Sequence, residues 1–122
     1  MEPHINGYIS DSNGYLLFKS AVADSNIKVN VDTGWSSMQA EYPEFLIYKL
    51  KDDLEILQVR DVDNTTRTFT RFGEGIVNYD QVLTALKQID FKGYLSFEEV
   101  FFDTAKEDAA NFLKYVEKWD AR

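Results

Sequence analysis

The sequence predicts an α/β fold in which parallel strands alternate with helices. Short apolar runs of strand length occupy residues 27–31, 54–59 and 94–99. Segments with helical spacing of apolar residues, or with helix-capping residues, separate these runs and follow the last one. Such alternation is typical of parallel sheets, because two parallel neighbours need a long connection and a helix usually supplies it.

The first ten residues, MEPHINGYIS, hold an acid and the sole histidine of the chain. We interpret this segment as the carboxyl end of a strand. Asp11 or Ser12 is expected to cap a helix over 14–22, because both side chains can accept a hydrogen bond from a free N–H of the first turn. The apolar side of this helix comprises Leu16, Leu17, Ala21 and Val22. Asp24-Ser25-Asn26 has turn chemistry.

Asp32-Thr33-Gly34 predicts a turn directly after the first strand, and a polar loop is expected over 36–41. Pro43 and Glu44 suit the first turn of a short helix, where proline is tolerated and a carboxylate meets the positive end of the helix dipole. The buried face predicted for this helix comprises Phe45, Leu46, Ile47 and Leu50. The next strand leads into a long polar connection over 61–72.

Asn78 opens a further helix, with Gln81 at the position of a capping box. The apolar residues of this helix are Tyr79, Val82, Leu83, Leu86 and Ile89. Thr104 and Glu107 predict another capping box ahead of a terminal amphipathic helix. The apolar face of that helix comprises Ala105, Ala109, Phe112, Leu113, Val116 and Trp119. No linker is visible, so residues 1–122 are interpreted as one domain.

Composition excludes several classes of function. The chain has 122 residues and a net charge of −8, with 13 Lys and Arg against 21 Asp and Glu. Nucleic acids and anionic membranes need a basic face, so neither is expected as a partner. The chain contains no cysteine, which excludes disulfides and Cys-based zinc sites. The start of the chain does not resemble a signal peptide and no apolar run approaches the roughly 20 residues of a membrane helix, so a cytoplasmic location is expected.

Polar side chains stand where each predicted strand ends. Asp32 follows the first strand directly, Gln58 and Arg60 lie at the end of the second, and Glu98 lies at the end of the third. The carboxyl ends of parallel strands share one edge of a sheet, and ligands bind at that edge. We therefore expect these side chains to lie together.

Four landmarks in this order resemble the xylose isomerase-like TIM barrel superfamily, which includes sugar phosphate isomerases and epimerases, ketose 3-epimerases and inosose dehydratases. They are Asp32-Thr33-Gly34, Gln58-Val59-Arg60-Asp61, Gly73-Glu74-Gly75, and Gly93-Tyr94 followed by Glu98. The resemblance covers nearly the whole chain. It corresponds only to the C-terminal half of a (β/α)8 barrel, the last four β/α units. The length agrees with half a barrel, because a full barrel takes about 250 residues.

The resemblance implies a divalent metal, Mn or Mg, held at the strand ends. Carried over by position, the metal ligands are Glu2, Asp32, Gln58 and Glu98. Glu2 and Glu98 would also be catalytic, relaying a proton next to a sugar carbonyl. Two positions depart from the family: Gln58 stands where a histidine is usual, and Trp35 where a second histidine is common. A glutamine oxygen is a neutral and weaker ligand.

Contacts to a small sugar or sugar phosphate are predicted for His4, Trp35, Arg60, Gly73 and Gly75. These residues, like the predicted ligands, also have structural interpretations. Asp32 caps the turn after its strand, and Glu99 rather than Glu98 points outward. Arg60 pairs with Asp61 at the barrel rim. His4 packs in a turn, Trp35 fills the space of a histidine, and Gly73-Glu74-Gly75 is a flexible loop.

Three strands and a strand end cannot close a barrel, and they would leave sheet edges unpaired. The side chains expected to be partly uncovered on the inner face are Val29, Val31, Ile56, Val59, Leu95 and Phe97. We therefore expect a homodimer of half-barrels, or a complementing half-barrel chain.

The predicted function is metal-dependent sugar isomerisation or epimerisation, by a natural half-barrel or a truncated or degenerate relative. The alternative is a non-catalytic sugar-binding or assembly module of the same fold. An open flavodoxin-like domain is a third possibility, but two of the roughly five strands it needs are not found.

Overall fold

The computed structural model describes residues 1–23 and 26–121. Two residues of the turn predicted at Asp24-Ser25-Asn26, Asp24 and Ser25, lie outside the described residues. The elements in chain order are α1 (Ser12–Val22), β1 (Val29–Asp32), α2 (Thr33–Met38), α3 (Pro43–Lys49), β2 (Leu54–Val59), β3 (Asp61–Val62), β4 (Phe69–Thr70), α4 (Tyr79–Gln88), β5 (Tyr94–Phe97) and α5 (Ala105–Asp120).

Strands β1, β2 and β5 form a parallel sheet in that order, which confirms the predicted α/β fold. The main chain of Met1 lies beside β1. Its amino group donates to the carbonyl of Lys28 (2.7 Å), and its carbonyl accepts from the N–H of Asn30 (2.7 Å). This is the hydrogen-bond pattern of a parallel ladder, so the segment before α1 meets the sheet as a strand end does.

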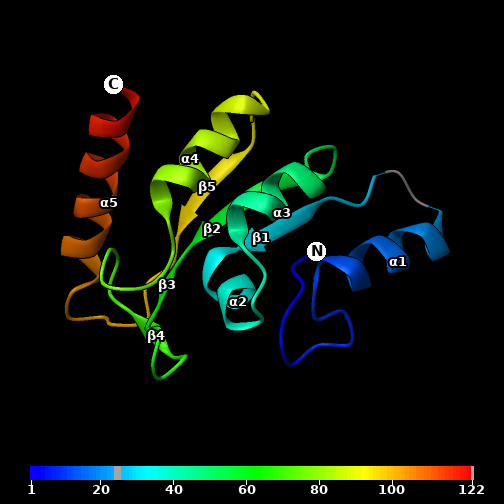
Figure 1. Cartoon of the computed structure of the whole chain (residues 1–122), viewed down its shortest axis with the longest axis horizontal. Coiled ribbons are helices and arrows are strands. Elements are labelled where there is room, and N and C mark those ends of the chain that lie inside the picture. The colour runs from blue at the N-terminus through cyan, green and yellow to red at the C-terminus, as the bar shows by residue number, and fades with distance from the viewer. Residues whose placement is uncertain (24–25, 122) are drawn as a thin grey trace.

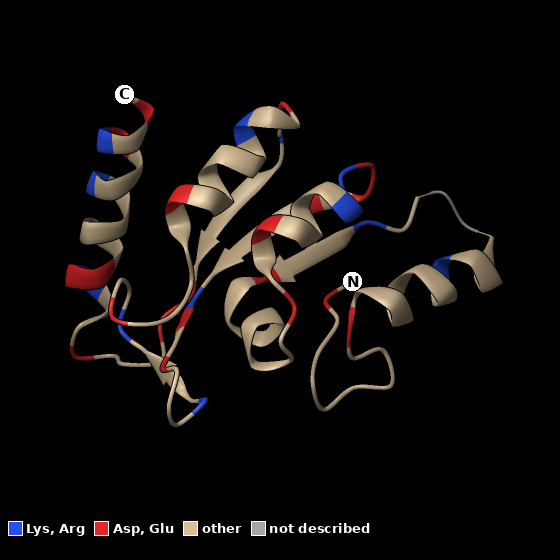
Figure 2. Ribbon diagram, in the orientation of Figure 1, with Lys and Arg blue, Asp and Glu red and all other residues tan. Residues whose placement is uncertain are grey.

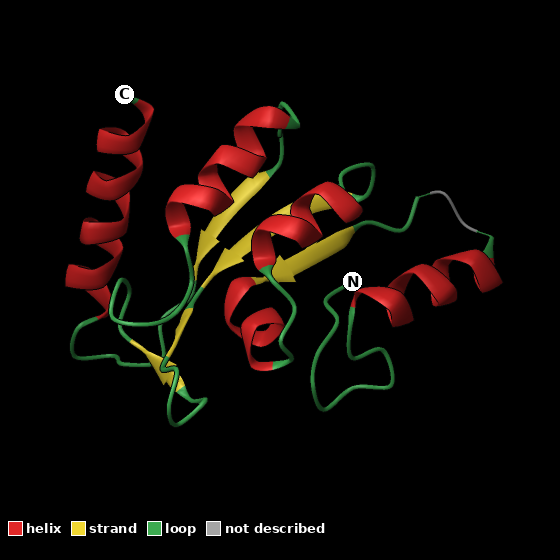
Figure 3. Cartoon of the chain, in the orientation of Figure 1, coloured by secondary structure: helices red, strands yellow, loops and turns green. Residues whose placement is uncertain are grey.

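Helices α3 and α4 cover one face of the sheet, while α1 and α5 lie at opposite ends of the molecule (Figures 1 and 3). The core forms between that sheet face and the two covering helices. Its members include Val29, Val31, Leu57, Leu46, Ile47, Val82, Leu83 and Leu86. The strands therefore turn their apolar residues toward the helices.

The opposite face of the sheet is polar, which corrects the prediction of an apolar inner face. Val29, Val31 and Val59 are at most 3% exposed because they point to the helices. Asn30, Ile56 and Tyr94 are partners across the strands, as are Asp32, Gln58 and Ser96. Side chains alternate along a strand, so these two rows share the face without helices. Of the six residues predicted there, only Ile56 lies on it.

Two elements were missed in segments predicted to be loops. The expected loop over 36–41 overlaps α2, whose buried hydroxyls Ser36 and Ser37 donate to the carbonyls of Asp32 (2.6 Å) and Thr33 (2.7 Å). The polar connection 61–72 contains the antiparallel pair β3 and β4. The serines of α2 bond carbonyls of their own segment, and in the hairpin Asp63 accepts from the N–H groups of Thr65 and Thr66. Polar side chains thus satisfy the backbone in both segments, and neither shows an apolar pattern.

Helix α1 begins as predicted, with Asp11 accepting from the N–H of Gly14 (2.7 Å). Its predicted apolar side is wrong, because Leu16, Leu17 and Val22 are exposed. Tyr15 and Ser12 are the buried residues instead, and the hydroxyl of Tyr15 donates to the carbonyl of Ile27 (3.0 Å).

The other helices agree with the sequence in part. Asn78 caps α4 by accepting from the N–H of Gln81 (3.1 Å), as predicted. The capping box at Thr104 is wrong: its side chain makes no cap bond, and its hydroxyl donates to the carbonyl of Phe101. Phe45 and Leu113, predicted to be buried, are 65% and 61% exposed. Within the described ranges, no helix is both long and apolar enough to cross a membrane.

An ion pair holds α5 against the segment after β4. Arg71 donates from Nε and Nη2 to both carboxylate oxygens of Asp108, at 2.6–3.1 Å. These hydrogen bonds lower the pKa of Asp108, and burial opposes them. The rings of Phe72, Phe97 and Phe112 pack against one another and join the same segments. This contact connects α5 to the hairpin.

Asp108→Asn should lower the melting temperature by about 5 °C at pH 7, because Arg71 then loses its buried charged partner and keeps the ion pair with the exposed Glu107. A folded-state pKa below the ordinary value stabilises the protein above that value and ceases to do so as the pH falls through the lowered pKa. The difference between the two proteins should therefore shrink below about pH 4. Thermal melts followed by circular dichroism from pH 7 to pH 2 measure this. Asp90→Asn, in an exposed pair with Lys92, is the control. Equal melting temperatures of Asp108→Asn and the wild-type protein at pH 7 would refute the prediction.

Candidate functional site

Arg60 joins the carboxyl ends of β1 and β5 from its position just past β2. Its Nε and Nη2 atoms donate to Oδ2 of Asp32, at 2.8 Å and 2.7 Å. Its Nη1 atom lies 3.4 Å from Oε1 of Glu98. Figure 2 shows a basic position among acidic ones along the chain just past the end of β2. The strand-end side chains of the described sheet therefore meet around one guanidinium group.

Asp32, at the end of β1, both caps α2 and pairs with Arg60. Its Oδ1 atom accepts from the N–H of Trp35 (2.8 Å) and so caps α2. Its Oδ2 atom accepts from Arg60, and the side chain is fully buried. The capping interpretation made from the sequence is confirmed, and both carboxylate oxygens are bound within the chain.

Two aromatic rings pack against the guanidinium group of Arg60. Its Cζ atom lies 5.2 Å from the ring centre of Trp35 and 4.3 Å from that of Phe69. A Cβ atom on Gly34 would lie 2.7 Å from the Phe69 ring, so glycine provides room for this ring. Sequence reasoning missed Phe69, although it is one of two aromatic residues in the polar segment 61–72. Only 9% of Arg60 is exposed.

The start of the chain reaches the same site. The His4 ring centre lies 4.2 Å from that of Trp35. The pKa of Glu2 is raised, first by partial burial and then by the negative charges of Asp32 and Glu98, while Arg60 opposes this shift. Glu2 is therefore close enough to Asp32, Arg60 and Glu98 for their charges to shift its pKa.

Gly73 and Gly75 act on a different group from the one predicted. Their N–H groups donate to Oδ2 of Asp61, each at 3.1 Å, and the N–H of Val77 donates to Oδ1 (3.1 Å). Asp61 is 2% exposed and also accepts from Val62. This corrects the proposed contact of these N–H groups with a substrate, because a carboxylate of the chain takes them. It also corrects the Arg60–Asp61 pair, since Arg60 bonds Asp32.

The donor set does not fit a divalent cation as the chain is folded. Asp32 has no free oxygen, and Oε1 of Gln58 accepts from Nδ2 of Asn30 (2.7 Å). Glu98 faces the guanidinium group. Among residues 1–23 and 26–121, no group of three or more His, Cys, Asp or Glu side chains is arranged to hold a metal ion. These contacts do not test metal binding itself, so the Mn or Mg site implied by the resemblance stays a prediction.

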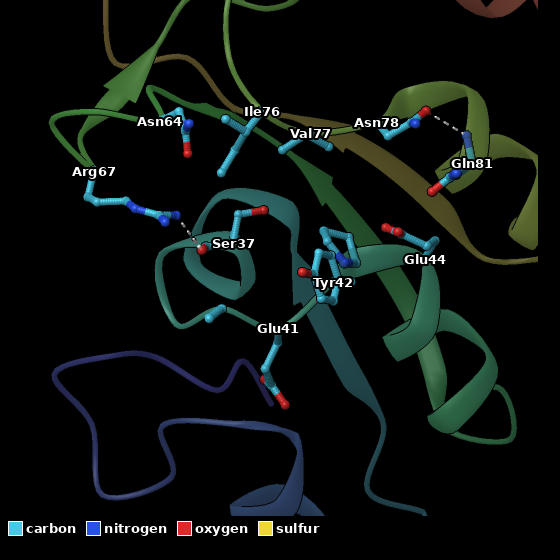
Figure 4. A pocket seen from close by; sticks show the side chains of 12 residues that line it. Ser37, Glu41, Tyr42, Glu44, Asn64, Arg67, Ile76, Val77, Asn78 and Gln81 are labelled. Atoms are coloured by element: carbon cyan, nitrogen blue, oxygen red, sulfur yellow. Dashed lines mark hydrogen bonds between the residues drawn. The ribbon is translucent and has the colours of Figure 1, made fainter.

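The space beside Arg60 is small. A recess lined by Arg60, Phe69 and Glu98 has a volume of about 10 Å³, which suits about one water molecule. A larger hollow of about 390 Å³ lies between α2, the hairpin and the first turns of α3 and α4, and Arg67 and Glu41 are among its lining residues (Figure 4). None of the predicted site residues lines this hollow. The strand-end site is thus an open edge rather than a closed pocket.

Comparison with known proteins identifies the barrel to which this edge corresponds. A family model described as xylose isomerase-like TIM barrel matches residues 1–116. No curated protein sequence matches the chain. The fold is similar to that of a D-tagatose 3-epimerase-like protein, with 23% identity, a TM-score of 0.68, and coverage of 80% of this chain and 38% of that one.

Two further solved structures are similar. The probable 3-DHS dehydratase AsbF of Bacillus anthracis, described as involved in petrobactin synthesis, has 19% identity, a TM-score of 0.76, and coverage of 90% of this chain and 46% of that one. A xylose isomerase domain protein of Planctomyces limnophilus has 19% identity, a TM-score of 0.70, and coverage of 89% and 41%. The chain spans less than half the length of these structures, which agrees with part of a barrel.

Gly75→Ala should destabilise the fold by about 2 kcal/mol or more, because the added Cβ atom collides with Oδ1 of Asp61 and disturbs its buried hydrogen bonds. Urea unfolding measures the loss. Gly14→Ala is the matched control, since a Cβ there makes only ordinary contacts inside α1 and improves helix propensity. Equal stability of the Gly75→Ala and wild-type proteins would show that Asp61 does not need this arrangement.

Proposed function

We propose, because the chain belongs to the xylose isomerase-like TIM barrel family, that it forms the C-terminal half of a sugar isomerase or epimerase site. The observation that carries this proposal is the convergence of Asp32, Arg60 and Glu98, with Glu2 beside them, at the carboxyl edge of the sheet. Active sites of TIM barrels lie at this edge. The likeness to a D-tagatose 3-epimerase-like protein supports a sugar as the substrate class.

The proposed reaction moves a proton next to the sugar carbonyl. A carboxylate removes a proton from the carbon beside the carbonyl, and the electron pair of the C–H bond moves to form an enediolate. A carboxylic acid then returns a proton to the opposite face of the same carbon, or to the neighbouring carbon. Glu98 is half-exposed at the strand end and suits the base. Partial burial and the nearby carboxylates raise the pKa of Glu2, which favours its protonated form and suits it to the role of the acid.

A non-catalytic sugar-binding or assembly module is the second candidate. It is favoured by the small recess beside Arg60 and by the engagement of both Asp32 oxygens within the chain. A site of this size does not enclose a sugar. Either the chain binds without turnover, or further protein surrounds the edge.

We propose further that a second half-barrel, from another copy or a complementing chain, covers the open face. Tyr94 is 70% exposed on that face, and β5 has no strand partner beyond β2 among the described strands. Unpaired strand edges invite pairing. Additional strands would also enclose the recess beside Arg60.

Deuterium exchange tests the catalytic proposal. Incubation of the chain with D-tagatose and with D-xylose in D₂O should remove the proton signal of the carbon next to the carbonyl, as followed by proton NMR. Glu98→Gln and Glu2→Gln should each slow exchange by about 10²-fold or more, because general acid–base catalysis contributes at least that much. Glu55→Gln, an exposed carboxylate on β2 outside the site, is the matched control. Sugar binding without exchange would favour the module instead.

Sedimentation velocity tests the association. The chain should sediment as a dimer at micromolar concentration, and Tyr94→Lys should shift it toward monomer by placing a charge on the open face. Phe45→Lys, at a residue that is 65% exposed on α3, should leave the sedimentation coefficient unchanged. A stable, monodisperse monomer of the wild-type chain would refute the proposal.

A further inference from the structure

We infer that the guanidinium group of Arg60 is the resident cation of this site and excludes a divalent metal ion from the edge of the sheet. The inference deepens the proposed function and rests on it only for the chemistry of the substrate. Its structural part rests on the contacts of Arg60 with Asp32 and Glu98.

The charges around Arg60 require a cation at this point. The side chain of Asp32 is fully buried and that of Arg60 is 9% exposed. A buried carboxylate needs a charged partner or a metal ion, and Arg60 supplies two donors to one of its oxygens. A divalent ion at Asp32 would have to displace these bonds and leave a buried guanidinium group beside it. The two cations are therefore mutually exclusive.

Arg60 is also held in place from its backbone. The hydroxyl of Thr33 donates to the Arg60 carbonyl (2.6 Å) and accepts from its N–H (2.9 Å). The hydroxyl of Tyr79 donates to the same carbonyl (2.9 Å). Trp35 and Phe69 cover the guanidinium group. Helices α2 and α4 and the hairpin therefore all position this side chain, so the cation is built into the fold.

A fixed guanidinium group can do part of what a Lewis acid does. In the proposed reaction, negative charge develops on the carbonyl oxygen as the proton leaves the neighbouring carbon. A positive hydrogen-bond donor near that oxygen lowers the energy of the transition state. Nη1 makes only a long contact of 3.4 Å with Glu98, so it is the donor best able to turn to a substrate oxygen. We therefore assign to Arg60 the binding of the carbonyl oxygen of a sugar, without a metal ion.

Manganese binding tests the structural part. Electron paramagnetic resonance should detect no binding of Mn²⁺ by the wild-type chain at 100 μM, and Mn²⁺ should not change its melting temperature. Arg60→Gln removes the charge and frees Oδ2 of Asp32 and Oε1 of Glu98. Mn²⁺ should therefore bind at least tenfold more tightly than to wild type and raise the melting temperature by about 5 °C. Arg60→Lys keeps the charge and should still exclude Mn²⁺.

Three outcomes overturn this part. They are Mn²⁺ binding by the wild-type chain that Asp32→Asn abolishes, failure of a folded Arg60→Gln variant to bind Mn²⁺, and binding by Arg60→Lys. Should Arg60→Gln fail to fold, the wild-type and lysine measurements decide.

Deuterium exchange with a chelator separates this inference from the proposed function. Exchange by the wild-type chain should persist in EDTA and fall about 10²-fold in Arg60→Gln. Exchange that requires added Mn²⁺ would overturn the inference and keep the proposed function. Absence of exchange under both conditions, with Mn²⁺ still excluded, would overturn the proposed function and keep Arg60 as the resident cation.

Discussion

The buried pair of Asp32 and Arg60 constrains the carboxyl edge of the sheet more than any other contact there. Removing one partner of such a pair costs about 3–5 kcal/mol, because the other charge stays buried. Asp32 also caps α2, so the same carboxylate fixes the helix that follows β1. Arg60 also forms an ion pair with Glu98, just past the end of β5. One pair therefore sets the relative positions of three strand ends.

Local features near this edge cover its buried charges. Gly34 leaves room for Phe69, whose ring covers Arg60. The hairpin that carries Phe69 is short and polar, and it has no core of its own. Beside it, the N–H groups of Gly73 and Gly75 surround Asp61, which fixes the segment between the hairpin and α4. The hairpin thus packs on the charge of Arg60, and the segment after it bonds the charge of Asp61.

The strands of the sheet and most of the helix caps, which depend on local sequence patterns, were predicted correctly. Features that depend on contacts between distant side chains were not. Strand β2 and the cap at Asn78 follow from apolar runs and capping chemistry, and both were found. Helix α2 was missed because its buried hydroxyls look like a loop. The burial of Tyr15 and the exposure of Leu17 depend on packing at a distance. For the site, the strand ends placed Asp32, Arg60 and Glu98 together, yet no pattern in the sequence shows that Arg60 bonds Oδ2 of Asp32 while the N–H of Trp35 takes Oδ1.

The polarity of the open sheet face has a consequence for how the site is completed. Asn30 and Gln58 bond each other on that face, and Tyr94 and Ser96 stand exposed on β5. An apolar inner face would associate with almost any hydrophobic surface, whereas a polar row needs a partner with matching donors and acceptors. In the proposed assembly, the partner surface would have to tolerate the negative charges of Glu2 and Glu98. Because Arg60 would supply the positive charge inside, the complementing strands would have to enclose a bound sugar and exclude water without bringing metal ligands.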